Sequence, residues 1–166
     1  MSDSYFYDTL PKKRMAAGAL LLDEQGNILI VKPTYRPDWL LPGGSIEEDE
    51  SPRAGCEREV LEEIGLDIPA ISLLSIDYVS RVPDKNESVQ FIFYSGVLSA
   101  EQIQRITLPP DELSEYRFVP VAEAEKLLSP RLAVRMAPSL HALKEGTTAY
   151  LEDGRETWAP AEAVSS

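Results

Sequence analysis

The segment from Gly43 to Ile68, GGSIEEDESPRAGCEREVLEEIGLDI, constrains the fold of this chain most, because it gathers carboxylates and still carries the signals of a helix. Ser51 is a typical N-cap residue, Pro52 suits the first helical position, and Gly65 is typical of the position just beyond a helix end. The sequence therefore predicts a helix over residues 52–64, enclosed by two glycine-containing turns.

The acidic residues of this helix share one side of it. Glu59, Glu62 and Glu63 are separated by one, three or four residues, so their side chains point in similar directions. Gly55 lies one turn earlier on that side, and a glycine inside a helix is typical of a place that another group approaches closely. The apolar residues of the opposite side are expected to pack on the core and to leave the carboxylates pointing away from it: Ala54, Val60, Leu61 and Ile64.

Neighbouring carboxylates at this spacing repel one another, and the repulsion grows where a pocket excludes water. Hard divalent cations such as Mg²⁺ prefer oxygen ligands and would compensate for the repulsion. Taken alone, the hexapeptide REVLEE is more typical of a solvated helix face with Arg58 in a surface ion pair. The spacing of the residues around it decides between the two interpretations.

The wider pattern is a set of glycines, acids and one arginine at fixed intervals: Gly44, Glu50, Arg58, Glu59, Glu62, Glu63 and Gly65, with apolar Val60 and Leu66. This pattern resembles the Nudix box, the signature of the Nudix hydrolase family, at every position that the signature specifies. The resemblance implies an α/β (α+β) fold, an α/β/α sandwich with a mixed β-sheet. It also implies an enzyme in which water attacks phosphorus in a diphosphate, with the help of Mg²⁺ or Mn²⁺.

The resemblance assigns roles to these residues. Glu59 and Glu63 would be the main metal ligands, and Glu62 a further ligand or the base that orients the attacking water. The backbone carbonyl of Gly44 would add another metal-binding oxygen. Arg58, with Glu50, would hold the acidic side chains in place, and it belongs to the predicted catalytic set.

Outside the box, the family often supplies another acid from a late loop, and Glu112 is the first candidate here, with Glu115 second. A solvated loop position is about as probable for both. Lys32, Tyr35 and Arg36 precede the box and are candidates for binding the distal phosphates or the base of a substrate.

The rest of the chain predicts strand pairs with helices between them, all in a single domain over residues 1–166. Residues 1–13 would form an N-terminal arm, and residues 147–166 a C-terminal hairpin and tail. The apolar runs 16–22 and 28–31 read as a hairpin, 71–80 and 88–98 as a second strand pair, and 115–121 as a short strand. Helices are predicted over 121–129 and 130–146, the second bent or split at Pro138.

Four further residues have structural interpretations. Trp39 is predicted to pack beneath the loop before the box, and Phe91 to pack in the core. His141 is expected on a helix surface. Cys56 is expected to be a small buried filler, since this is the usual fate of a lone cysteine.

Charge and composition limit the partners. The chain has 16 Lys and Arg against 28 Asp and Glu, a net charge of -12 at pH 7, which repels nucleic acids and anionic membranes. The sequence therefore predicts a small diphosphate substrate and neither a nucleic acid nor a membrane as partner. The single cysteine and the lack of a long apolar segment predict a cytoplasmic protein. The aromatic residues Tyr5 to Tyr7 leave a homodimer possible.

Several functions stay open at this point. The substrate is predicted to be a nucleoside diphosphate derivative, but a non-nucleotide diphosphate is the alternative. A domain with this fold that senses a nucleotide metabolite without hydrolysing it is a second alternative. An isomerase of diphosphates is disfavoured because Cys56 inside the helix is poorly placed for catalysis, and removal of RNA 5′ ends is disfavoured by the negative charge.

Overall fold

The structure is a computed structural model, and its description covers residues 6–7 and 9–157. Tyr5, Trp158 and the predicted tail after it lie outside the described residues. No helix among the described residues is long and apolar enough to span a membrane.

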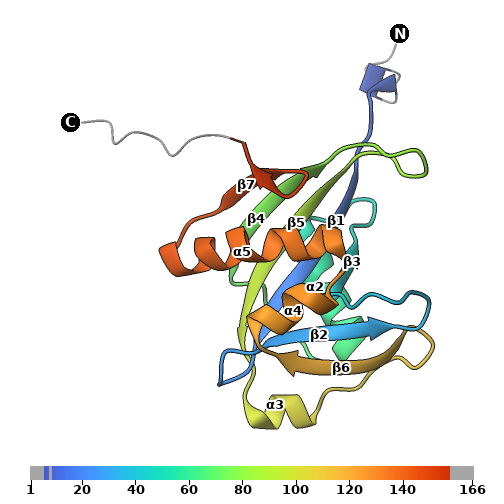
Figure 1. The fold of residues 1–166 in the computed structure, drawn as a ribbon. Coiled ribbons are helices and arrows are strands. Elements are labelled where there is room, and N and C mark those ends of the chain that lie inside the picture. Colours follow the sequence, from blue (N-terminus) through green and yellow to red (C-terminus); the bar gives the residue numbers. More distant parts are fainter. Residues whose placement is uncertain (1–5, 8, 158–166) are drawn as a thin grey trace, which may run out of the picture.

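One mixed β-sheet forms the centre of the molecule (Figure 1). Its strands are β1 (Arg14–Leu22), β2 (Ile28–Pro33), β3 (Gly43–Ser45), β4 (Ser72–Val79), β5 (Ser88–Val97), β6 (Leu113–Val119), β7 (Ala149–Glu152) and β8 (Arg155–Glu156). The order across the sheet is β6-β2-β1-β5-β4-β7-β8, and β3 pairs with β1. The pairs β1–β5 and β4–β7 are parallel, whereas the others are antiparallel.

Helices cover both faces of this sheet. Helix α2 (Pro52–Ile64) packs against one face, while α4 (Val121–Leu127) and α5 (Pro130–Glu145) pack against the other (Figure 1). A short helix, α3 (Ala100–Gln104), follows β5. Because successive strand residues point to opposite faces, β1 contributes to two hydrophobic clusters, one under α2 and one under α4 and α5. The arrangement is the α/β/α sandwich with a mixed sheet that the sequence predicts.

The first predicted hairpin is only partly formed. Its turn is present, and the carboxylate of Asp23 accepts hydrogen bonds from the backbone of Gln25 and from Asn27. However, β1 and β2 pair only at Leu22 and Ile28, after which they separate. Strand β3 enters the space between them and pairs with the first half of β1. Both apolar runs are largely buried and find other partners, β5 for β1 and β6 for β2, so hydrophobic pattern alone did not identify the pairing.

The remaining elements lie close to their predicted positions. Strands β4 and β5 form the second antiparallel pair, and β7 and β8 form the C-terminal hairpin. Strand β7 also joins the sheet edge beside β4. Helix α5 is continuous through Pro138, so of the predicted bend or split at this residue the split does not occur. Its buried face, which includes Met136 and Ser139, holds the helix on the sheet on both sides of the proline.

Two buried polar contacts fix α5 over β4. Arg135 donates a hydrogen bond from Nε to the Asp77 carboxylate at 2.5 Å, and the two side chains are 8% and 1% exposed. The hydroxyl groups of Ser75 and Ser139 lie 2.8 Å apart. Asp77 also accepts a hydrogen bond from the backbone N–H of Gly154, so the same carboxylate attaches the C-terminal hairpin.

Candidate active site

Helix α2 begins and ends where the sequence predicts. The Ser51 hydroxyl accepts a hydrogen bond from the backbone N–H of Ala54 at 3.1 Å, which satisfies a donor left free at the helix start. At the other end Gly65 adopts a left-handed conformation with φ of 72°, and its N–H donates to the Leu61 carbonyl. A glycine reaches this conformation without the strain of a side chain.

The predicted orientation of the helix is wrong in one respect. Its buried residues are Gly55, Cys56, Val60 and Ile64, whereas Ala54 is exposed and Leu61 is 48% exposed. Glu59 and Glu63 are next to the buried stripe and are themselves only partly exposed, so they do not point away from the core. The helix turns these carboxylates toward β3, because the close approach of the preceding loop at Gly55 fixes its rotation. A methyl group at Gly55 would lie 2.6 Å from Ile46.

Glu63 is the most deeply placed acid of the site. One of its carboxylate oxygens accepts a hydrogen bond from the backbone N–H of Gly43 at 2.7 Å. Burial, and after it the charges of Glu59, Glu112 and Glu62, raises the pKa of Glu63 to about 8. A carboxyl group in this state binds a proton or a cation more readily than an ordinary surface acid.

Glu59 lies directly behind Gly44 of β3. A methyl group added at Gly44 would lie 2.5 Å from the Glu59 carboxyl carbon, so only glycine leaves room for this side chain. Burial raises the pKa of Glu59, although the neighbouring Arg58 acts in the opposite direction. The two glycines of β3 therefore bring backbone atoms close to two acidic side chains of α2.

Arg58 joins the acids of the box and the loop before it. Its guanidinium donates two hydrogen bonds to Glu50, at 2.8 and 3.0 Å, and one each to Glu59 and Glu62, at 3.0 and 3.1 Å. It also donates to the backbone carbonyl of Ser45. These bonds hold the pKa of Glu50 at about 2, and they raise that of the guanidinium itself. A planar group with five donors suits such a position better than an ammonium group.

The two loop acids differ in their surroundings. The charge of Glu112 is among those that raise the pKa of Glu59 and Glu63, so this residue lies near the cluster. The Glu112 carbonyl accepts a hydrogen bond from Thr34, which ties its loop to the end of β2. Glu115 instead forms an ion pair with Arg117 at 2.6 Å on β6. The geometry favours Glu112 over Glu115 as a member of the site.

The donor atoms fit a hard divalent cation. They are carboxylate oxygens of Glu59, Glu62, Glu63 and Glu112, beside backbone that carries no side chain at Gly44. Within residues 6–7 and 9–157, no three acidic, histidine or cysteine side chains converge closely enough to form a ready-made metal site. Arg58 and the Gly43 N–H donate hydrogen bonds to carboxylate oxygens that would otherwise be free to bind a cation. Binding of a cation therefore requires small movements of these side chains.

A cleft of about 660 Å³ adjoins this cluster at β3. Gly43, Gly44 and Ser45 line its edge, but the four carboxylates do not line it. Tyr35 and Arg36 are in its wall, whereas Lys32 is not and donates a hydrogen bond to the Pro37 carbonyl instead. The cleft and the acidic cluster therefore adjoin each other at β3.

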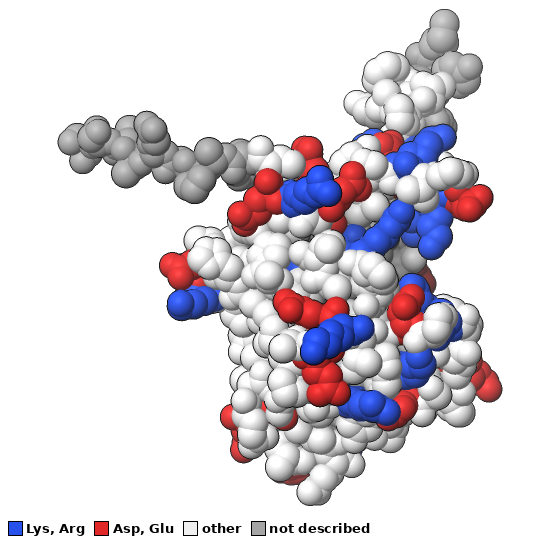
Figure 2. Space-filling view, viewed as in Figure 1, with Lys and Arg blue, Asp and Glu red and all other residues white. Residues whose placement is uncertain are grey.

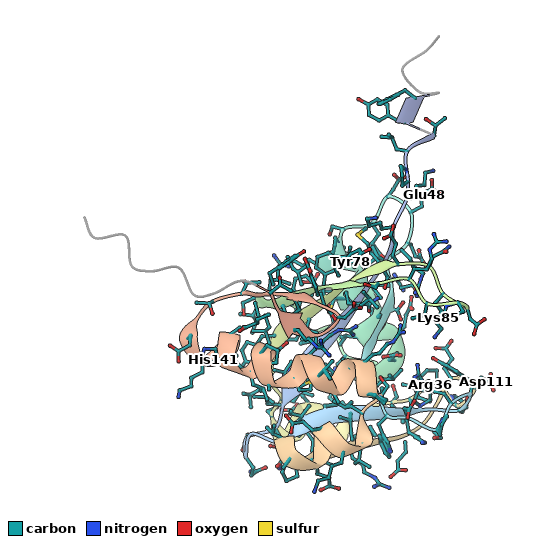
Figure 3. The ribbon with its side chains drawn as sticks, turned by 45° about the horizontal axis from the view of Figure 1, so that its top comes forward. Arg36, Glu48, Tyr78, Lys85, Asp111 and His141 are labelled. Carbon is teal, nitrogen blue, oxygen red and sulfur yellow. The ribbon has the colours of Figure 1, made fainter. Side chains whose placement is uncertain are left out.

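Other residues singled out in the sequence have the following places. Trp39 is buried, 6% exposed, in the cluster beneath α4 and α5, and Phe91 packs on the opposite cluster while also bordering the cleft. His141 is exposed on α5, on the side of the molecule away from Arg36 and Lys85 (Figure 3). Cys56 is 1% exposed, and burial raises the pKa of its thiol to about 12, so it is not a nucleophile.

Sequence reasoning missed three basic residues of the cleft wall: Arg14, Lys85 and Arg131. They come from the start of β1, the loop between β4 and β5, and the first turn of α5. No local pattern marks any of them, since each is an ordinary surface cation in its own segment. Only the positive charges they share with Arg36 in one cleft set them apart.

The fold and the site together define a hydrolase of the Nudix type. The family model of the NUDIX domain matches residues 12–143 of the chain. The 8-oxo-dGTP diphosphatase of Proteus vulgaris is 32% identical over 85 residues, which cover 48% of this chain and 74% of that protein. Diphosphoinositol polyphosphate phosphohydrolase 2 of Rattus norvegicus is 38% identical over 56 residues, covering 33% of this chain and 31% of that protein.

The fold has solved counterparts as well. The NUDIX domain of Shewanella oneidensis NrtR, solved in complex with ADP ribose, superposes with a TM-score of 0.66 at 20% identity, over 86% of this chain and 99% of that one. This chain belongs to the Nudix hydrolase family. It is accordingly an enzyme that acts on acid anhydrides containing phosphorus.

Proposed function

We propose that the protein is a divalent-metal-dependent pyrophosphohydrolase that cleaves the diphosphate linkage of a nucleoside diphosphate derivative by attack of water at phosphorus. The observation that carries this proposal is the cluster of partly buried acids held against the glycine backbone of β3. In that cluster Glu63 has a pKa near 8, because burial and neighbouring charges oppose its ionisation. Such a cluster has an unfavourable electrostatic energy until cations are bound.

In this proposal Glu59 and Glu63 bind Mg²⁺ or Mn²⁺ together with the Gly44 carbonyl, and Glu62 is a further ligand or the base. The bound cation would neutralise charge on the diphosphate and make the attacking water more acidic. Glu62 fits the second role because its side chain is 55% exposed and therefore accessible to a water molecule. Glu112 adds a further carboxylate from the loop before β6.

Arg58 acts through the acids rather than on the substrate. Its five donors are directed at Glu50, Glu59, Glu62 and Ser45, which fixes the directions of the metal-binding oxygens. Removing a residue that orients metal ligands in this way usually lowers metal affinity or activity about 10- to 100-fold. Arg36 and Tyr35 in the cleft wall are the proposed substrate contacts.

The relatives do not select one substrate. One is named for 8-oxo-dGTP and another for diphosphoinositol polyphosphate, and the short matches leave most of the second protein uncovered. The neighbour that binds ADP ribose supports a nucleoside diphosphate derivative. A non-nucleotide diphosphate is the alternative. The single cysteine supports a cytoplasmic location, and a homodimer is compatible with the exposed aromatic residues Phe6 and Tyr7.

The test is a phosphate-release screen over nucleoside diphosphate derivatives and non-nucleotide diphosphates, each with Mg²⁺, with Mn²⁺ and with a chelator. We expect turnover of at least one nucleoside diphosphate derivative, and loss of it with the chelator. Turnover that persists without divalent cations, or turnover of non-nucleotide diphosphates alone, would contradict the proposal.

A metabolite-sensing domain without catalysis is the second candidate. The neighbour that binds ADP ribose is the observation in its favour. The intact set of acids in this chain argues against it, because binding alone does not require the buried, costly carboxylate of Glu63. Tight binding of a nucleotide in calorimetry, with no hydrolysis of it over many hours, would favour this second function.

A further inference from the structure

The cleft beside β3 has the opposite charge to the rest of the molecule. The chain has a net charge of -12, yet the charged side chains in the cleft wall are five cations and one acid: Arg14, Arg36, Lys85, Arg131, Arg135 and Asp84. Figure 2 shows Lys and Arg side chains gathered near the loop that joins β4 and β5. A cleft lined by one sign of charge concentrates ligands of the other sign.

Most of these cations are not neutralised by the protein itself. Arg135 is paired with buried Asp77, and Arg36 forms an ion pair with Asp38 at 3.1 Å. Arg14, Lys85 and Arg131 form no ion pair within the described ranges. The charge of Arg131 also lowers the pKa of Asp153, so an acid outside the cleft wall lies near this cation, while all three cations face one space.

Each of these three side chains comes from a defined element or turn of the fold. Arg14 is the first residue of β1 and pairs with Ser88, the first residue of β5. Lys85 closes a tight turn in which its backbone exchanges hydrogen bonds of 3.0 Å with Val82. Arg131 lies in the first turn of α5, where the backbone partial charge is positive as well. Figure 3 shows Lys85 on the same side of the molecule as Arg36.

These cations are not at the place where the diphosphate would be cleaved. The carboxylates proposed to bind the metal belong to α2 and its side of the sheet, whereas Arg131 belongs to α5 on the other side. The two regions adjoin at β3, and none of the four carboxylates lines the cleft. A diphosphate bound by metal at the acids leaves these cations free for another group of the same molecule.

We infer that the cleft binds an anionic group of the substrate outside the scissile diphosphate, so that the substrate class is diphosphates that carry an additional phosphate. This inference rests on the proposed function, since it takes the diphosphate to lie at the acids of α2. Arg131 and Lys85 are the residues that recognise the additional phosphate, with Arg14 beside them.

The experiment compares pairs of diphosphates that differ by one phosphate monoester. NADPH and NADH form one pair, coenzyme A and dephospho-coenzyme A a second, and each pair places the extra phosphate differently. Inhibition constants are measured against any diphosphate that the enzyme hydrolyses. We expect the more phosphorylated member of at least one pair to bind about tenfold more tightly, as a charged hydrogen bond would give.

Arg131→Gln and Lys85→Gln should each reduce this preference and leave the affinity for the less phosphorylated member unchanged. The control is Arg105→Gln, which removes the same charge from an exposed arginine after α3, outside the cleft wall. Circular dichroism and the unfolding temperature show whether each variant is folded. If one of the two cleft variants does not fold, the other still tests the inference.

Equal binding of both members in both pairs would overturn the inference, and so would an equal effect of Arg105→Gln and the cleft variants. If no diphosphate is hydrolysed, the proposed function fails. Calorimetry of the same pairs in the presence of Mg²⁺ then still decides whether the cleft prefers the extra phosphate.

Discussion

The two faces of the central sheet carry charge in different ways. On the α2 face, Arg58 forms ion pairs with three carboxylates, Glu50, Glu59 and Glu62, all of them partly exposed. On the α5 face, the buried pair of Asp77 and Arg135 is complete, and the adjoining cleft holds Arg14, Lys85 and Arg131, which form no ion pair in the described part of the chain. The α2 face has excess negative charge where we propose that cations bind, and the α5 face has excess positive charge where we propose that an anion binds.

We infer that uncompensated charge beside a cleft marks a binding region, whereas the buried and fully paired charges of Asp77 and Arg135 serve the structure. An unneutralised charge next to a cleft costs stability until a ligand of opposite sign arrives. The pair of Asp77 and Arg135 has no such deficit, and it holds a helix and a hairpin in place. This contrast predicts opposite effects for similar acid-to-amide substitutions on the two faces.

The largest effect on stability is expected for Asp77→Asn. The substitution leaves the Arg135 guanidinium buried without its counter-charge, which typically costs about 3–5 kcal/mol. For a chain of this size the unfolding temperature should fall by about 6–20 °C. Thermal unfolding measured by circular dichroism checks this.

The matched control is the double substitution of Asp77→Leu with Arg135→Met, which removes both charges. It should recover more than half of the lost stability, because replacing a whole buried pair is far less costly than breaking it. If the double variant is as unstable as Asp77→Asn, the pair is not what holds α5 over β4.

On the other face, Glu63→Gln should reduce kcat/KM by at least about 100-fold, since a lost metal ligand costs more than the loss of a residue that orients one. Glu62→Gln should likewise abolish most turnover. In both variants the circular dichroism spectrum should stay nearly unchanged. Steady-state kinetics at saturating Mg²⁺ provides the measurement.

Glu125→Gln is the control for these two, because Glu125 is an exposed acid of α4 outside both regions. It should keep the wild-type rate. Wild-type turnover in Glu63→Gln would remove that residue from the site, and wild-type turnover in Glu62→Gln would do the same for Glu62.

Arg58→Lys tests whether positioning alone matters. The positive charge remains, but an ammonium group cannot make two parallel bonds to Glu50 and still reach Glu59 and Glu62. We expect a fall in kcat/KM of about 10- to 100-fold and a higher Mg²⁺ concentration for the half-maximal rate, because poorly oriented ligands bind the metal less tightly. Wild-type kinetics in Arg58→Lys would mean that a positive charge at this position is enough and that the several donors of the guanidinium are not needed.

The smallest effect is a pH dependence of stability in metal-free protein. The pKa of Glu63 is about 8 in the folded chain against 4.5 for an ordinary glutamate, so the folded state binds the proton more tightly. Stability should therefore fall as pH rises from about 4.5 to about 8. Glu50 acts in a separate window: its pKa of about 2 gives stability that is lost only as pH falls below 4.5.

Unfolding temperatures measured with a chelator at pH 5, 6.5 and 8 check the first window. The decline should be smaller in Glu63→Gln, and Mg²⁺ should reduce it in the wild type, because a cation replaces the proton. An identical decline in wild type and Glu63→Gln would mean that other groups cause it.

Much of the fold was predictable because its signals are local. The ends of α2 follow from Ser51, Pro52 and Gly65, and the second strand pair follows from two runs rich in β-branched and aromatic residues. The partners of β1 and β2 were not predictable, since two largely buried apolar strands fit several neighbours equally well. The rotation of α2 was predicted wrongly because its apolar stripe is narrow and Leu61 lies at the exposed edge.

The sequence by itself determined the family, the helix that carries the acids and the chemistry of their oxygen atoms, because those residues lie within one stretch of 23 positions, Gly44 to Leu66. Only the tertiary structure decided which acids are buried, that Gly43 and Gly44 contact Glu63 and Glu59, and that cations from β1, the β4–β5 loop and α5 share one cleft. The reason is physical: residue spacing along a helix fixes directions within that helix, whereas burial and the meeting of distant segments depend on how separate elements pack.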